Sequence, residues 1–97
     1  MKPIQFYVRS KLCGYNVLAI IDWTSSRKWI SSGLLKKIER LTRRTFTHII
    51  LRSEIMVDRN GINWVVSGYI RMANLLTGSV TKFYILEIAH DLLILND

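Results

Sequence analysis

The sequence has one cysteine and one proline, and it has no long run of apolar residues. Cys13 alone cannot form an internal disulfide, which favours a reducing compartment. No metal site is expected, because Cys13, His48 and His90 are far apart in the sequence and form no CxxC or HxxxH pair. No cofactor is expected either, because the chain lacks a glycine-rich phosphate loop, a nucleophile elbow and a paired-carboxylate motif.

The apolar stretches are too short for a membrane span. None approaches the ~18 residues that cross a bilayer, and the longest, residues 83–95, is interrupted by Glu87 and Asp91. Near the start of the chain, Arg9 and Lys11 interrupt any secretory signal. The sequence therefore predicts a cytoplasmic protein without a membrane-spanning segment.

The chain does have enough apolar material for one packed core. Hydrophobic residues make up 49% of the 97 residues and charged residues make up 22%. This composition excludes a disordered tail, and the length predicts a single domain over residues 1–97.

The positive charge is concentrated in one segment. The net charge is +7, and half of the 14 lysines and arginines lie within residues 27–44, where Glu39 is the single acid. The rest of the chain is nearly neutral. A concentrated charge of one sign indicates an anionic partner more strongly than the total charge does.

The hydrophobic pattern predicts short strands around one helix. Alternating or continuous apolar runs are typical of strands, and the Asn60-Gly61 pair predicts a tight hairpin turn. The period becomes helical over residues 33–45, with residues 25–32 as a first turn or lead-in. Residues 71–78 are ambiguous, and residues 72–76 within them could form a single helical turn that stops at Gly78. The strands are expected at residues 4–8, 17–21, 48–57, 62–70, 80–88 and 92–95.

The order of these elements, ββαββ(α)ββ, predicts an α+β fold. Short turns join most neighbouring strands, so the sheet should be antiparallel, with about five to six strands and one amphipathic helix packed on it. Either of two serine pairs, Ser25-Ser26 or Ser31-Ser32, could cap the start of the helix.

The predicted helix has an apolar face and a basic face. Its apolar face should contain Ile30, Leu34, Ile38 and Leu41, which recur at helical spacing. The opposite arc carries cations, and a tryptophan joins them if the helix starts early. The candidate nucleic-acid-binding residues are therefore Trp29, Lys36, Lys37, Arg40, Arg43 and Arg44.

This basic face predicts a small cytosolic protein that associates with nucleic acid without catalysis. Clustered Lys and Arg side chains neutralise phosphates, and Trp29 could stack on an unpaired base. Other interpretations stay open, namely a solvated helix face that only keeps the protein soluble, an acidic protein partner, or an anionic membrane surface. The membrane ranks last, because the core needs the same apolar residues.

A second function class is a protein-binding inhibitor or regulator of a host enzyme, of the kind that phages or mobile elements encode. The tryptophans Trp23, Trp29 and Trp64 support it, because exposed Trp beside Arg is frequent at protein interfaces. The alternative is that these side chains belong to the core, Trp64 before the others.

A third function class is RNA cleavage. His48, Arg52 and Glu54 would lie on the exposed face of a strand, where His can move a proton and Arg can hold a phosphate; such a row can equally be a polar face without chemistry. Residues 77–95, TGSVTKFYILEIAHDLLIL, resemble the closing hairpin of RelE- and MqsR-type messenger-RNA-cleaving toxins. The resemblance implies a small, basic, RNA-acting protein of mobile elements. No residue is assigned as catalytic, and the hairpin at the start of this chain departs from the helices that usually follow the first strand in that family.

Overall fold

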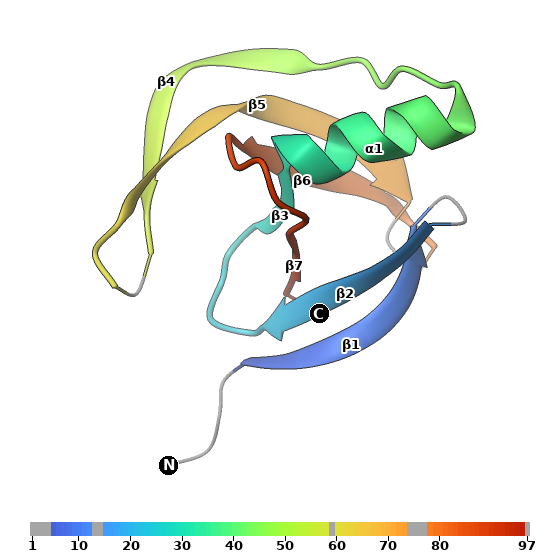
Figure 1. Ribbon diagram of the computed structural model, residues 1–97. Coiled ribbons are helices and arrows are strands. Elements are labelled where there is room, and N and C mark those ends of the chain that lie inside the picture. The colour runs from blue at the N-terminus through green and yellow to red at the C-terminus, as the bar shows by residue number, and fades with distance from the viewer. Residues whose placement is uncertain (1–4, 13–14, 59, 74–77, 97) are drawn as a thin grey trace.

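The computed structural model describes residues 5–12, 15–58, 60–73 and 78–96 (Figure 1). Among these residues, no helix is long and apolar enough to cross a membrane. The elements, in chain order, are β1 (Gln5–Leu12), β2 (Tyr15–Asp22), β3 (Lys28–Ser31), α1 (Ser32–Thr42), β4 (Ile49–Val57), β5 (Asn63–Ala73), β6 (Val80–Leu86) and β7 (Leu93–Leu95).

The strands form one seven-stranded mixed sheet in the order β1-β2-β7-β3-β6-β5-β4. β2 pairs with β7 in parallel, and so does β3 with β6, whereas the other neighbours are antiparallel. The predicted α+β fold with an antiparallel sheet is therefore wrong. The described part of the chain is mostly strands with one short helix, and its sheet is mixed.

The main cause of this difference is β3. The helical spacing of Ile30 and Leu34 favours a helical lead-in over residues 25–32, but the chain forms a strand at Lys28–Ser31. The last three residues of β3 are all buried. A central strand is covered on both faces and shows no alternation of apolar and polar residues, so its sequence does not distinguish it from a buried helical turn.

The position of β3 also separates two strands that the sequence predicts as a hairpin. β3 lies between β6 and β7, pairing in parallel with one and antiparallel with the other. Residues 80–88 and 92–95 therefore form no closing hairpin, and the resemblance to the toxin hairpin has no counterpart in the strand order.

Two other predicted hairpins are confirmed. β1 pairs with β2, and β4 pairs with β5, both antiparallel. Gly61, in the turn between β4 and β5, has a φ of 77°, a conformation that glycine adopts readily. Cys13 and Gly14, between β1 and β2, lie outside the described residues. So do residues 74–77 of the predicted second helical turn, and before them β5 continues as a strand to Ala73.

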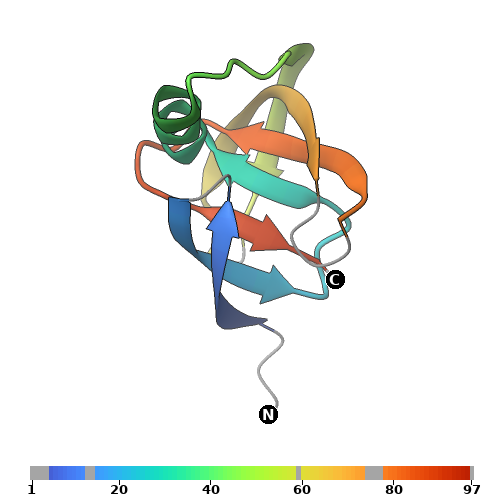
Figure 2. The ribbon, with the colours of Figure 1, turned by 90° about the vertical axis from the view of Figure 1, so that its right-hand side faces the viewer.

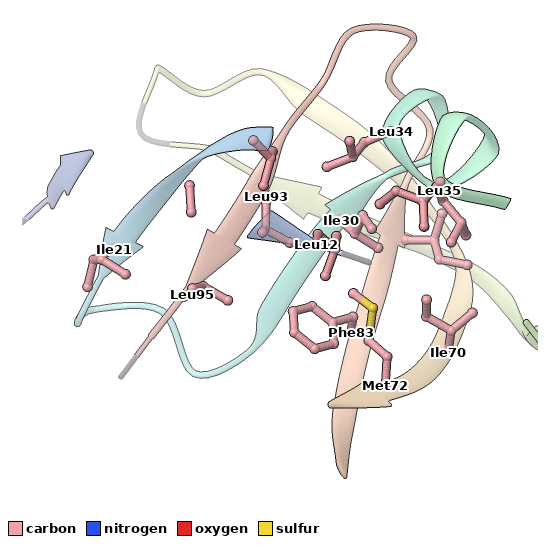
Figure 3. Close-up of a cluster of buried hydrophobic side chains, with 14 residues drawn as sticks. Leu12, Ile21, Ile30, Leu34, Leu35, Ile70, Met72, Phe83, Leu93 and Leu95 are labelled. Atoms are coloured by element: carbon pink, nitrogen blue, oxygen red, sulfur yellow. The ribbon is translucent and has the colours of Figure 1, made fainter. Parts of the chain in front are cut away.

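α1 covers one face of the sheet and is seen nearly end-on in Figure 2. Figure 3 shows Leu34 and Leu35 directed onto the sheet beside Ile30 and Leu93, and all four are buried. Leu41, by contrast, is 62% exposed, so the predicted apolar face is wrong at that position. The helix ends at Thr42, not at residue 45, because its C-cap Arg43 takes a left-handed conformation.

The opposite face of the sheet holds a second, smaller cluster of buried residues. It consists of Trp29, Val66, Leu86 and Ile88, with Met56 and Trp64 among the partly buried side chains around them. β4 and β5 are strongly bent (Figure 1), and their pairing register shifts between Ile50 and Glu54. The pairing of β5 with β6 also shifts in register, between Val66 and Gly68. Gly68 lies so close to β4 that a Cβ atom on it would be 2.1 Å from the carbonyl oxygen of Ile49. The bend therefore depends on glycine and lets the far end of the hairpin contribute to the second cluster.

Candidate functional site

The first residues of α1 hold the helix at a fixed place on the sheet. Ser31 is the N-cap, and its buried hydroxyl accepts hydrogen bonds from the backbone N–H groups of Leu34 and Leu92, both at 3.1 Å. The N–H of Gly33 donates to the carbonyl oxygen of Ile88 at 3.0 Å. Of the two serine pairs that could cap the helix, Ser31-Ser32 is the one used, and this anchorage orients the basic side of α1 toward solvent.

Four basic side chains project from α1 and from the segment after it. We call these residues, Lys36, Arg40, Arg43 and Arg44, the helix cations. All four are exposed, and none forms an ion pair within the part of the chain that the structure describes. Lys36 and Arg40 are one helical turn apart and line a surface hollow of about 450 Å³, in which Glu87 is the one acidic lining residue.

Two acids close to α1 have partners of their own. Asp91 Oδ1 accepts a hydrogen bond from Lys37 Nζ at 2.8 Å, and this bond raises the pKa of Lys37. Glu39 Oε2 accepts a hydrogen bond from the N–H of Phe46 at 2.9 Å and lies 3.4 Å from His48 Nε2. The charge of Lys37 is therefore compensated locally, unlike the charges of the helix cations.

Trp29 does not lie beside the helix cations. It belongs to β3, is 7% exposed, and donates from Nε1 to Ser25 Oγ at 3.1 Å. The prediction that it joins the basic arc of the helix is wrong, because β3 precedes α1 and places Trp29 in the cluster on the other face of the sheet. Trp64 is partly buried in the same cluster, whereas Trp23 is exposed. The structure thus gathers the five predicted cations at α1 and separates Trp29 from them.

The predicted polar row in β4 is not assembled. His48 precedes the strand and lies beside Glu39, while Glu54 pairs with Arg27. The register shift between Ile50 and Glu54 interrupts the two-residue alternation that would align His48, Arg52 and Glu54. The arrangement that could carry out acid–base chemistry on a phosphodiester is therefore not formed. Within the described ranges, no group of three or more His, Cys, Asp or Glu side chains could hold a metal ion.

A row of aromatic side chains crosses the sheet on the face opposite α1. Tyr69 of β5 is paired with Tyr84 of β6, and Tyr84 is paired with Trp29 of β3. The ring centroids of the two tyrosines are 5.6 Å apart, and those of Tyr84 and Trp29 are 5.7 Å apart. Both tyrosines are partly exposed, so Trp29 forms the buried end of a row that opens toward β5.

Three cations lie next to this aromatic row. Arg27 precedes β3, and Lys82 of β6 is directly opposite Arg71 of β5. The Arg27 guanidinium lies 4.2 Å from the ring centroid of Tyr84, and Lys82 Nζ lies 4.7 Å from that of Tyr69. We call the whole set, Arg27, Trp29, Tyr69, Arg71, Lys82 and Tyr84, the aromatic–basic platform.

Two hollows border the aromatic–basic platform. One, of about 380 Å³, is lined by Arg27, Lys28, Lys82, Tyr84 and three uncharged polar side chains. The other, of about 420 Å³, is lined by Tyr69 and Arg71 together with Thr47 and Ile49. Among the described residues, no acidic side chain lines either hollow. An anion could therefore approach Lys82 through the first hollow and Arg71 through the second, whereas Arg27 is already paired with Glu54.

The sequence contains a signal for this platform that is spread over three separate segments. Three pairs of a cation and an aromatic residue two positions apart belong to the platform, namely Arg27-x-Trp29, Tyr69-x-Arg71 and Lys82-x-Tyr84. The same spacing occurs outside it at Tyr7-x-Arg9 and Arg44-x-Phe46. Residues two positions apart in a strand lie on the same face. Each pair alone is unremarkable, and only the strand order β3-β6-β5 brings the three pairs together.

No family model, no curated protein and no solved structure matches this chain.

Proposed function

We propose that this protein binds nucleic acid, without catalysis, through the helix cations. The observation that carries the proposal is that all four side chains are exposed and lack an acidic partner among the described residues. An uncompensated cluster of cations attracts the phosphate backbone and gains free energy from the counterions that it releases. A cytoplasmic location belongs to the same proposal.

The acids near α1 support nucleic-acid binding over the alternative that this helix face only keeps the protein soluble. An acid is within reach of the helix, since Asp91 pairs with Lys37, yet among the described residues no acid pairs with the helix cations. Glu39, the single acid within α1, is instead turned to the segment after the helix, where it accepts a hydrogen bond from Phe46. Arginine also suits this role, since its planar guanidinium can donate two parallel hydrogen bonds to a phosphate.

The test uses two adjacent lysines as a matched pair. Fluorescence anisotropy with a labelled thymine oligonucleotide of about 16 nucleotides measures affinity at several salt concentrations. Lys36→Gln should lower the slope of log affinity against log salt by about 1. Lys37→Gln should leave the slope almost unchanged, because Asp91 already compensates its charge.

Replacing all four helix cations with glutamine should abolish the binding. Wild-type protein that does not bind would end the proposal. So would a four-fold variant that binds as tightly as the wild type with the same salt slope.

A second candidate function, the binding of a protein partner, is favoured by β4. It is an edge strand whose side chains Ile49, Ile50, Ile55 and Val57 are exposed. An edge strand of this kind is open to pairing with another chain. Ile50→Lys should then remove a stoichiometric partner from a pull-down treated with nuclease; a partner retained by the variant would exclude β4 as the contact.

A further inference from the structure

We propose that the aromatic–basic platform binds unpaired bases, so that the nucleic acid recognised by this protein is single-stranded. The inference rests on the proposed function in requiring a nucleic-acid ligand. It depends, however, on different residues, on the face of the sheet opposite α1.

Two cations of the platform repel each other. Arg71 and Lys82 are exposed and directly opposite each other on neighbouring antiparallel strands. Like charges in this position destabilise a sheet. Neither side chain forms an ion pair within the described ranges. A phosphate group bound beside them would reduce the repulsion. Each of the two cations lines a hollow that has no acidic lining residue among the described residues, Lys82 the first and Arg71 the second.

The aromatic row supplies ring surfaces on which bases can stack, and a site made only for phosphate lacks such surfaces. Tyr84 packs against both Tyr69 and Trp29, so the orientation of the two tyrosine rings is held before a ligand arrives. Lys82 and Arg27 lie over the two tyrosine rings. A base can stack on a tyrosine after the flexible lysine moves aside, or on the guanidinium plane of Arg27.

This arrangement fits a single strand better than a duplex or an acidic peptide. In a duplex the faces of the bases are stacked on one another and cannot reach Tyr69 or Tyr84. An acidic peptide would bind the cations, but it has no bases and would therefore gain nothing from the tyrosine rings. A strand with phosphates beside Arg71 and Lys82 can direct its bases toward the adjacent tyrosines, because the cationic and aromatic rows are neighbours in the sheet.

The experiment separates the contribution of the bases to the affinity from that of the phosphates. Three labelled probes of equal length are compared by anisotropy: a thymine single strand, an abasic single strand with the same phosphates, and a duplex. Wild-type protein should bind the thymine strand about tenfold more tightly than the abasic strand. Tyr69→Leu should lose most of this tenfold preference and should bind the abasic strand as the wild type does, whereas Tyr69→Phe should retain the preference.

Tyr7→Leu is the matched control, since Tyr7 is an exposed tyrosine on β1, at the far edge of the same sheet. It should bind all three probes like the wild type. Arg71→Gln serves as a second platform variant if Tyr69→Leu does not fold, because Arg71 is exposed and its loss should weaken single-strand binding severalfold with a lower salt slope.

Equal affinity of the wild type for thymine and abasic strands would overturn the inference. So would an Arg71→Gln variant that binds like the wild type, or a glutamate peptide that displaces the thymine strand from the platform as efficiently as an unlabelled thymine strand does. In each case, loss of binding in the helix-cation variants would leave the proposed function intact. Absence of binding to every probe would end both.

Discussion

Asp58 closes the turn between β4 and β5 with three hydrogen bonds. Its Oδ2 accepts from Trp64 Nε1 at 2.9 Å, and its Oδ1 accepts from the backbone N–H groups of Asn60 and Ile62, both at 2.9 Å. All three bonds favour the charged carboxylate. The bond from Trp64 is the largest cause of the lowered pKa of Asp58, followed by the bond from Ile62.

The lowered pKa predicts how stability depends on pH. Because the pKa of Asp58 in the folded state is below its ordinary value of 3.8, the stabilisation is fully present above that value and is lost as the pH falls through the folded-state pKa. Urea unfolding of the wild type and of Asp58→Asn should therefore differ most near neutral pH and converge in strong acid. A difference that stays constant down to about pH 2 would contradict this account.

At the same scale, the sequence identified the cations of α1 and of the segment after it, but not which of them is compensated by an acid. Their type and helical spacing can be read from the chain, because they lie within one segment. The ion pair of Lys37 with Asp91 and the burial of Trp29 depend on segments far apart in the sequence. Local spacing therefore predicts which side chains are available, whereas the compensation of their charge requires the fold.

At the scale of elements, the start of α1 and the strand before it are joined by close backbone contact. Gly33 packs against the segment between β6 and β7, and a Cβ atom on it would lie 1.9 Å from the carbonyl oxygen of Ala89. The sequence predicted the helix from its period and one of its caps. It did not predict β3, because a four-residue strand with three consecutive buried residues, followed directly by a helix, gives no alternation and no turn signal between the two elements.

Gly33→Ala should destabilise the protein although alanine is the better helix former. The helix-propensity gain is about 1 kcal/mol at most, and the clash with the backbone of Ala89 forces a shift of α1 whose cost we expect to exceed it, leaving a net loss of about 1–3 kcal/mol. Urea unfolding measures the difference. Lys36→Ala, an exposed position in the same helix, is the control and should change stability by less than about 0.5 kcal/mol. A stabilised Gly33→Ala variant would show that the contact with Ala89 does not constrain α1.

At the scale of the whole molecule, the three residues of β7 join two parts of the sheet. β7 lies between β2 and β3, so it is the sheet neighbour that connects the β1–β2 hairpin to the other described strands. This connection could not be predicted from the sequence. Short turns favour antiparallel neighbours, whereas β7 pairs in parallel with β2 although most of the chain separates the two strands in the sequence.

Weakening β7 should therefore loosen the β1–β2 hairpin before the other strands. Leu93 is fully buried, and Leu93→Ala should cost about 2–5 kcal/mol. Hydrogen exchange should show the amides of β1 and β2 losing protection first, while those of β5 and β6 keep more of theirs. Leu18→Ala, at an exposed position of β2, is the control and should change the exchange pattern little. Uniform loss of protection over all strands would contradict a separable hairpin.

The place of β7 in the sheet also imposes an order in time. During synthesis, β1 and β2 leave the ribosome before the residues of β7 have been made, an interval of several seconds at about 5–20 residues per second. A two-stranded hairpin is only marginally stable in water. Until translation has passed residues 93–95, the apolar side chains of Val17, Ala19 and Ile21 lack their final cover. The β1–β2 hairpin is therefore made before β7 but completes its packing only after β7, and during that interval it stays accessible to chaperones and proteases.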